Sequence, residues 1–119
     1  KTNGSFDETT ALDPVEGFLQ RLPLKFHTAD LYALSSEGHY LRVYTDKGSP
    51  LILMRISDAV KELAQTDGLQ VHRSWWVSRS SVVETRRKNG QRFLLLKDGT
   101  TAPVSRSFLP SLKSAGLDR

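Results

Sequence analysis

Residues 71–77 gather the side chains of this sequence that are best suited to binding an anionic partner. The segment reads VHRSWWV and holds both tryptophans and one of the three histidines. Arg73 carries a planar guanidinium that can donate two parallel hydrogen bonds, to guanine O6 and N7 or to phosphate oxygens. Ser74 can donate to a phosphate oxygen. If the segment is extended, Trp75 and Trp76 point to opposite faces, so we expect one in the core and the other against a neighbouring layer or at the binding surface.

Positive charge is concentrated in the part of the chain that this segment begins. Residues 71–113 contain nine Lys or Arg against two acids, a net charge of +7, whereas residues 1–70 have a net charge of −3. A field polarised in this way favours a polyanion as partner. A basic soluble protein without such a partner would have the same composition, so charge alone leaves both interpretations open.

Three further sets of residues could bind the same kind of partner. His39 follows a glycine-containing turn, where its ring could reach a base edge or a phosphate; the alternative is a surface or half-packed histidine. Arg106 is expected at the start of a helix, where free N–H groups and the helix dipole favour an anion. The third set lies next to the Asn89-Gly90 turn and comprises Arg86, Arg87 and Lys88. It could contact phosphate, or it could form a solvated strand edge that discourages aggregation.

The sequence offers little for catalysis or metal binding. Its 119 residues include no cysteine, which removes disulfides, thiolate metal sites and thiol nucleophiles together. The histidines lack the close spacing of a metal site, and no nucleophile elbow, paired-carboxylate or phosphate-loop motif is present. We therefore predict no enzymatic activity, no metal and no cofactor. No apolar run approaches the roughly 20 residues of a membrane-spanning helix.

The candidate residues are expected on a mainly β domain that follows a leader. Residues 1–17 are polar and acidic, and we predict a linker or leader that is ordered only if it docks on another part of the protein. Residues 18–119 are predicted to form the domain. Its first part, residues 18–23, is a short apolar element that ends at a proline and fits either a strand or a helical turn.

Alternating apolar and polar residues predict antiparallel strands from residue 24 onward. The strands are expected at residues 30–34, 39–45, 50–55, 69–71, 77–86, 91–96 and 100–104. A turn is expected at residues 35–38. The strands at residues 39–45 and 50–55, joined by a glycine-containing turn, are expected to form a hairpin, and the Asn89-Gly90 dipeptide predicts another. The sequence thus indicates a meander of short strands.

Two short helices complete the expected layout. The first is predicted near residues 58–65, with Ser57 as N-cap and Gly68 as a left-handed cap at its C-terminal end. The second is predicted near the C-terminus, where either Ser105 or Ser107 could cap it.

Four blocks, in order over about residues 24–116, resemble the LytTR DNA-binding domain family, the output module of many bacterial response regulators. They read DLYAL and GHYLRV within residues 30–43, RIS before the central helix, VHRSWWV at residues 71–77, and LLLKDG with PVSRSF within residues 94–108. Ser78 departs from the family pattern, because many members have Asn at this position. A local hydrogen bond is therefore expected to differ.

The resemblance implies a fold and a set of contact residues. The fold is an elongated antiparallel β-β-β sandwich with one central short helix and one short C-terminal helix, whose loops enter successive major grooves of double-stranded DNA. The family's base-contacting positions correspond here to His39, Arg73 and Arg106. The positions expected to contact the DNA backbone are Ser74, Ser105, Arg86, Arg87 and Lys88.

The resemblance also sets expectations about partners and location. Two copies are expected on direct-repeat DNA sites, as a homodimer or as paired monomers, and the domain is expected in the cytoplasm. The chain does not begin with Met, which suggests a piece of a longer protein. An upstream sensor, receiver or membrane segment would then supply the regulatory signal, and a membrane segment could tether the domain.

Two other functions stay open. A β-rich module that binds RNA or single strands would need exposed aromatic rings in a row on one sheet face, and the aromatic residues here are dispersed. A protein-interaction or ligand-sensing β domain would bind no nucleic acid in a salt-dependent way.

Overall fold

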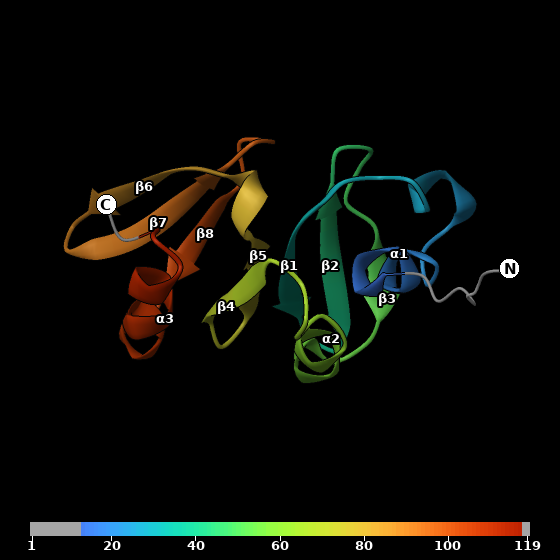
Figure 1. The fold of residues 1–119 in the computed structure, drawn as a ribbon, viewed down its shortest axis with the longest axis horizontal. Coiled ribbons are helices and arrows are strands. Elements are labelled where there is room, and N and C mark those ends of the chain that lie inside the picture. Colours follow the sequence, from blue (N-terminus) through green and yellow to red (C-terminus); the bar gives the residue numbers. More distant parts are fainter. Residues whose placement is uncertain (1–12, 118–119) are drawn as a thin grey trace, which may run out of the picture.

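A computed structural model describes residues 13–117, which form two antiparallel sheets and several short helices (Figure 1). Sheet A has the strand order β3-β2-β1-β5-β4, and sheet B has the order β6-β7-β8. The strands are β1 (Leu31–Glu37), β2 (Tyr40–Thr45), β3 (Leu51–Leu53), β4 (Gly68–His72), β5 (Trp75–Ser78), β6 (Val82–Lys88), β7 (Gln91–Leu96) and β8 (Thr101–Val104). The α-helices are α1 (Pro14–Leu19), α2 (Ile56–Glu62) and α3 (Leu109–Ser114), and the 3-10 helices are η1 (Leu24–Phe26), η2 (Arg79–Ser81) and η3 (Arg106–Phe108). The predicted fold class, a mainly β sandwich with antiparallel sheets and few short helices, is confirmed.

Sheet A is covered on both faces, which gives the elongated molecule of 55 × 28 × 23 Å two hydrophobic cores. The first core lies between sheet A and the helices α1 and α2, and its fully buried members include Phe18, Leu34, Leu41, Val43 and Leu63. The second core lies between the other face of sheet A, sheet B and α3, and its members include Ala33, Val77, Leu94, Leu96 and Leu112. The period-2 pattern arises where alternate residues of a strand enter a core, as Leu41 and Val43 of β2 enter the first core while Tyr40 stays exposed.

The two tryptophans pack into different cores. Trp76 is 2% exposed and belongs to the first core. Trp75 packs against the second core, where its ring stacks on Tyr44 with the ring centroids 5.4 Å apart. Of the two alternatives for the second tryptophan, the structure therefore shows packing against a neighbouring layer. Neither ring lies on the surface as a platform on which bases could stack.

Gly68 does not cap a helix, so that expectation is wrong. It begins β4 and is not among the glycines with positive φ. A Cβ added at this position would lie 1.9 Å from Cζ2 of Trp76. Gly68 is needed because the indole ring lies directly against its backbone. Helix α2 ends earlier, at Leu63, whose carbonyl accepts hydrogen bonds from the Thr66 N–H at 3.1 Å and the Thr66 hydroxyl at 2.6 Å.

The predicted serine caps are also wrong. Helix α2 begins at Ile56 with Arg55 as its N-cap, and Ser57 lies within the helix. Helix α3 has Phe108 as its N-cap and no capping hydrogen bond from a side chain. The reason is that η3 intervenes before α3, so Ser105 and Ser107 lie too early to cap it.

The apolar element after the leader is helical and begins before it was expected. Asp13 and Glu16 form a capping box at the start of α1, since the Glu16 N–H donates to Asp13 Oδ1 at 2.9 Å and the Asp13 N–H donates to Glu16 Oε1 at 3.3 Å. The helix therefore crosses residue 17, at which the sequence predicts the end of the leader. Residues 1–12 of the predicted leader lie outside the described residues.

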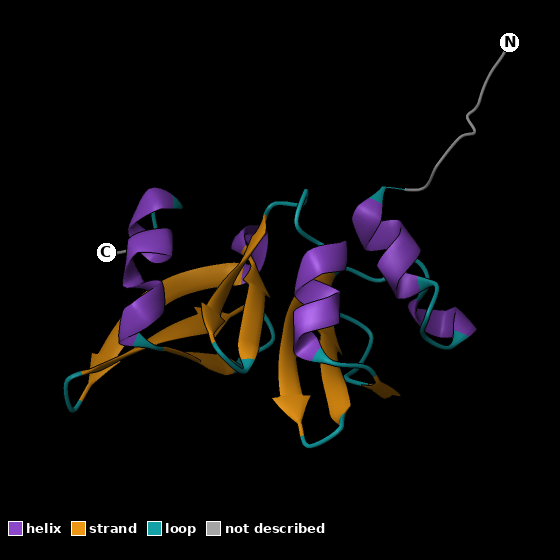
Figure 2. Cartoon of the chain, turned by 90° about the horizontal axis from the view of Figure 1, so that it is seen from below, coloured by secondary structure: helices purple, strands orange, loops and turns teal. Residues whose placement is uncertain are grey.

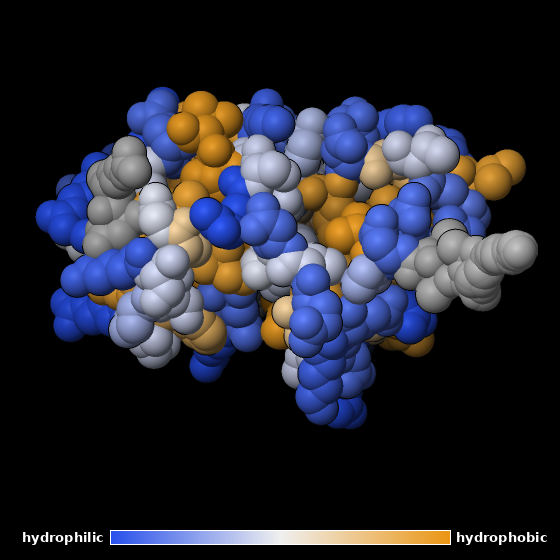
Figure 3. Space-filling view, viewed as in Figure 1, coloured by the Kyte–Doolittle hydropathy of each residue, from blue (hydrophilic) through white to orange (hydrophobic). Residues whose placement is uncertain are grey.

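The outer face of the molecule is polar over much of the view in Figure 3. Hydrophilic residues cover the outside of α2 and much of the surface around it, and apolar residues show over part of sheet B, near the middle of the molecule and at its right-hand end. Among residues 13–117, no helix is both long and apolar enough to cross a membrane.

Candidate nucleic-acid interface

His39 lies at the tip of the turn that joins β1 to β2. Glu37 pairs with Tyr40, so Gly38 and His39 alone form the turn, and Gly38 has a φ of +64°. The wider turn expected at residues 35–38 is wrong, because the chain stays in β1 up to Glu37. His39 is exposed. Its ring is consequently free to reach an external partner.

Arg73 and Ser74 form the tip of a second tight hairpin, between β4 and β5. His72 pairs with Trp75, so the segment that could have been one extended strand turns back on itself here. The Ser74 N–H donates to Nδ1 of His72 at 3.0 Å, and the Ser74 carbonyl accepts from the Ser36 N–H of β1 at 2.9 Å. These bonds hold the backbone of the turn in place, while the Arg73 side chain is exposed.

Ser105 and Arg106 lie where β8 leads into η3. The Ser105 N–H donates to the Val71 carbonyl at 3.0 Å, which ties this junction to β4. Arg106 is exposed and is the first residue of η3. Arg106 thus lies at the start of a helix as expected, but that helix is the three-residue η3, and α3 begins only at Leu109. Binding of an anion at this junction stays a prediction. What Arg106 offers an anion is its own guanidinium.

The basic hairpin between β6 and β7 has the predicted turn. Asn89 and Gly90 have φ values of +54° and +79°, as the type I′ turn of a two-residue hairpin requires. Arg86 forms an ion pair with Glu84 at 3.2 Å. Arg87 helps to line a hollow of about 670 Å³ between the hairpin and the β8–η3 junction. Other residues that line this hollow are His72, Ser105 and Arg106.

The strand register brings these turns to one edge of the molecule. Strand β1 is antiparallel to β2 and β5, and β4 is antiparallel to β5, so the β1–β2 and β4–β5 turns lie side by side. Arg92 of β7 pairs with both Arg87 and Val104, which places the basic hairpin beside the end of β8. Figure 2 shows the helices toward one side and the β1–β2 and β6–β7 turns toward the opposite side. All eight predicted contact residues therefore lie on or beside turns of this edge.

Some arginines of the protein are held in ion pairs, Arg86 of this edge among them, and others are not. Ion pairs hold Arg21 to Glu62 at 2.7 Å, Arg42 to Glu37 at 3.0 Å and Arg79 to Asp67 at 3.2 Å. Within residues 13–117, no acid pairs with Arg73, Arg87 or Arg106. A guanidinium without a protein carboxylate keeps its donors and its charge for an external anion.

The Glu37 carboxylate is the negative group next to the His39 turn. A hydrogen bond from Arg42 lowers the pKa of Glu37 below its ordinary value, so the carboxylate stays ionised near neutral pH. Arg42 also donates to the Ser49 carbonyl at 2.6 Å. Because the charges of Glu37 and Arg42 cancel, this pair adds no net positive charge next to His39.

Two residues of this edge were not singled out by the sequence. Arg55 lines a hollow together with His39, between the β1–β2 turn and the start of α2. His72 accepts the Ser74 N–H through Nδ1, which leaves Nε2 as its protonated nitrogen and a donor. The position of His72 inside the VHRS segment was a usable signal, and the hairpin predicted between residues 39–45 and 50–55 was the signal that could have placed Arg55 near His39.

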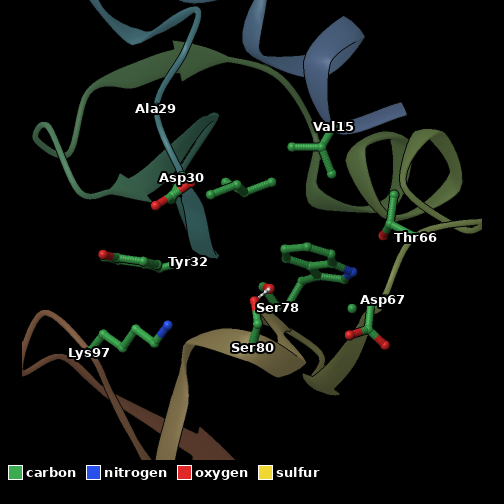
Figure 4. A pocket seen from close by; sticks show the side chains of 12 residues that line it. Val15, Ala29, Asp30, Tyr32, Thr66, Asp67, Ser78, Ser80 and Lys97 are labelled. Carbon is green, nitrogen blue, oxygen red and sulfur yellow. Dashed lines mark hydrogen bonds between the residues drawn. The ribbon is translucent and has the colours of Figure 1, made fainter. Parts of the chain in front are cut away.

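A second cavity lies at the opposite ends of the strands (Figure 4). Its volume is about 430 Å³, and its lining includes Asp30, Tyr32, Asp67 and Lys97. Acids outnumber the cation among these residues, and Asp67 is already paired with Arg79. Charge of mixed sign does not suit a polyanion, so the turn edge remains the candidate interface.

Residues 24–116 match the model of a protein family described as the LytTr DNA-binding domain, and this range is well over half of the chain. The chain belongs to this family. It is 26% identical over 106 residues to the CO-responsive transcriptional regulator RcoM of Rhodospirillum rubrum, covering 82% of this chain and 45% of RcoM. It is 43% identical over 86 residues to the transcriptional regulatory protein BtsR of Salmonella typhimurium, covering 71% of this chain and 31% of BtsR.

The LytTr chain thus spans less than half the length of these relatives. Among solved structures, it resembles the LytTr DNA-binding domain of a methyl-accepting/DNA response regulator from Bacillus cereus. The TM-score is 0.64 at 15% identity, and the match covers 72% of this chain and 80% of the other. At this identity the likeness establishes the fold.

Proposed function

We propose that this LytTr domain reads double-stranded DNA as the output domain of a bacterial transcription regulator. The observation that carries the proposal is the set of exposed turns along one edge, with the His39 ring at one end and with guanidinium groups at Arg73, Arg87 and Arg106 that no acid within residues 13–117 pairs with. The role is one of binding, with no catalytic group and no cofactor assigned.

The turns suit the major groove of a duplex. This groove is about 12 Å wide, enough to admit a two-stranded hairpin, and each base pair presents a distinct pattern of donors and acceptors there. His39, Arg73 and Arg106 would contact base edges. The molecule is 55 Å long, which exceeds the roughly 34 Å of one helical turn, so turns at its two ends can enter successive grooves.

Contacts to the DNA backbone would come from Ser74, Ser105 and the basic hairpin. The logarithm of the binding constant falls linearly with the logarithm of the salt concentration, and each phosphate neutralised by Lys or Arg adds about −0.9 to that slope. Affinity is thus expected to come largely from the backbone, and selectivity from the three base-contacting residues.

The regulatory setting is part of the same proposal. Two copies would bind direct repeats, as a dimer or as paired monomers, in the cytoplasm. This chain covers less than half of the length of the relatives that it matches. An upstream sensor, receiver or membrane segment would supply the signal in the parent protein.

Selection of bound sites from random duplexes tests the proposal and yields a cognate site. On that site Arg73→Ala should cost about 1–3 kcal/mol, with a much smaller loss on random DNA. Arg79→Ala is the matched control, because Arg79 is also exposed but pairs with Asp67 at the opposite ends of the strands. Equal losses on cognate and random DNA would reduce Arg73 to a phosphate contact.

A competition assay separates this proposal from binding of RNA or single strands. Trp76 is buried and Trp75 is stacked on Tyr44, which leaves neither indole free to stack on bases. Duplex DNA should therefore compete better than single-stranded DNA or RNA at matched salt. Preference for a single strand would overturn the proposal, and absence of any salt-dependent binding would favour a protein-interaction or ligand-sensing domain.

A further inference from the structure

Arg55 occupies the hollow beside the His39 turn, on the edge that carries the proposed DNA contacts. Tyr40 pairs with Leu53, so the chain that leaves β3 passes alongside the start of β2. The hollow is lined on one side by the β1–β2 turn and on the other by residues 53–58. Arg55 is thus a neighbour of His39 in space, although 15 residues separate them in sequence.

The backbone of Arg55 is fixed, whereas its side chain is not engaged. Its carbonyl accepts hydrogen bonds from the N–H groups of Asp58 and Ala59, both at 3.1 Å. The side chain is exposed, and no residue among 13–117 forms an ion pair or hydrogen bond with its guanidinium. Like Arg73, Arg87 and Arg106, Arg55 therefore has an exposed guanidinium that no acid among residues 13–117 pairs with.

The electrostatics around His39 make this cation important. Glu37 and Arg42 cancel each other in an ion pair, and Asp58 adds a negative charge to the lining of the same hollow. Without Arg55, the charged side chains that line this hollow would have a net negative charge, which disfavours a phosphate there. Arg55 is therefore the group that can hold DNA where His39 is to read it.

We propose that Arg55 binds a backbone phosphate that flanks the groove entered by His39. This proposal rests on the duplex-binding function argued above and adds one residue and one partner atom to it. A phosphate is a better partner than a base because Arg55 lies beside the turn and not at its tip, which His39 occupies. Phosphates line the rims of the groove, and base edges lie at its floor.

Salt-dependent binding of duplex DNA by the whole chain tests the assignment. Arg55→Ala should lower affinity about five-fold at 0.15 M salt, equally on cognate and random duplexes, and should make the slope of log K against log salt shallower by about 0.9. Arg55→Lys should retain most of the slope. Lys61→Ala is the matched control for net charge, because Lys61 is exposed on the last turn of α2, away from the hollow.

A second variant, Asp58→Asn, should change the affinity for DNA in the opposite direction. Asp58→Asn removes the acid from the hollow and should strengthen binding on all duplexes, while an unchanged thermal midpoint would show that α2 persists. If Asp58→Asn weakens binding in a folded protein, the hollow does not face phosphate and the assignment is wrong.

Neutral methylphosphonate links in the cognate duplex locate the contact. In the wild-type protein, a neutral link next to the base whose preference is lost in His39→Ala should weaken binding. In Arg55→Ala the same link should cause no further loss, since the partner is already absent.

The outcomes separate the two proposals. If the wild-type protein shows no salt-dependent binding to duplex DNA, the proposed function fails and the Arg55 contact fails with it. If the wild type binds but Arg55→Ala matches Lys61→Ala in slope, only the Arg55 assignment is overturned. A loss confined to the cognate site would instead make Arg55 a base-reading residue and would equally overturn the phosphate contact.

Discussion

The two ends of the candidate edge differ in charge. At the sheet B end, the basic hairpin and the β8–η3 junction share one hollow, whose lining includes Arg87 and Arg106. At the sheet A end, His39 shares its hollow with one cation, Arg55, and one acid, Asp58. Phosphate neutralisation supplies much of the affinity of DNA-binding proteins, whereas base contacts supply selectivity. The difference suggests that the sheet B end holds the duplex and that the sheet A end adds selectivity with little affinity of its own.

Neutralising the basic hairpin should have the largest effect on affinity. It tests directly whether the sheet B end holds the duplex. The triple variant Arg86→Gln, Arg87→Gln and Lys88→Gln should lower affinity about 100-fold at 0.15 M salt on every duplex, and the salt slope should become shallower by about 2–3. Titrations at several salt concentrations would measure both quantities. A matched triple variant of Lys25, Lys47 and Lys61 to Gln removes the same charge elsewhere. Equal losses in the two triple variants would mean that net charge alone attracts the DNA.

Gly68→Ala should destabilise the fold and should affect both ends together. The added Cβ meets the Trp76 ring at 1.9 Å, and overpacking of this kind costs about 1–3 kcal/mol of unfolding free energy. Chemical denaturation would measure the change. Gly17→Ala is the control, because a Cβ there meets nothing within 4 Å. If Gly68→Ala were as stable as wild type, the packing of Trp76 on β4 would not limit stability. A loss of selectivity at one end alone would show that Gly68 acts on the interface and not on the fold.

His39→Ala should have the smallest effect on affinity. It tests whether the two ends of the edge read different bases. One hydrogen bond contributes about 0.5–1.5 kcal/mol, so affinity for the cognate site should fall by about that amount and affinity for random DNA should hardly change. Site selection repeated with His39→Ala and with Arg106→Ala would show which base preferences each variant loses. The two variants should lose preferences at opposite ends of the site. Loss of the same base in both would mean that the two residues do not read separate grooves.

The parts of the fold that were predictable are those with a local cause. Alternation of apolar residues predicted the strands because alternate side chains of a strand enter a core, and Asn89-Gly90 predicted its hairpin because both residues must take positive φ. Gly68 was misread because its cause is not local. The ring that excludes a side chain there belongs to Trp76, in the partner strand.

The candidate site divides in the same way. His39, Arg73 and Arg106 could be picked out because each has a turn or a charge pattern next to it in the sequence, reinforced by the family resemblance. Their roles on DNA stay predictions. Arg55 was not picked out, although the sequence predicts the hairpin between residues 39–45 and 50–55. Its position beside His39 depends on the register of that hairpin, in which Tyr40 pairs with Leu53, and the strand pattern alone does not set this register.

The placement of Trp75 and Trp76 gives the protein two built-in optical probes. They are the chain's only tryptophans and neighbours in sequence, yet one indole reports on the helix-covered core and the other on the core shared with sheet B. Intrinsic fluorescence therefore averages over both halves of the molecule. Replacing one ring at a time would let the emission of the other show whether the two cores melt as one unit or separately.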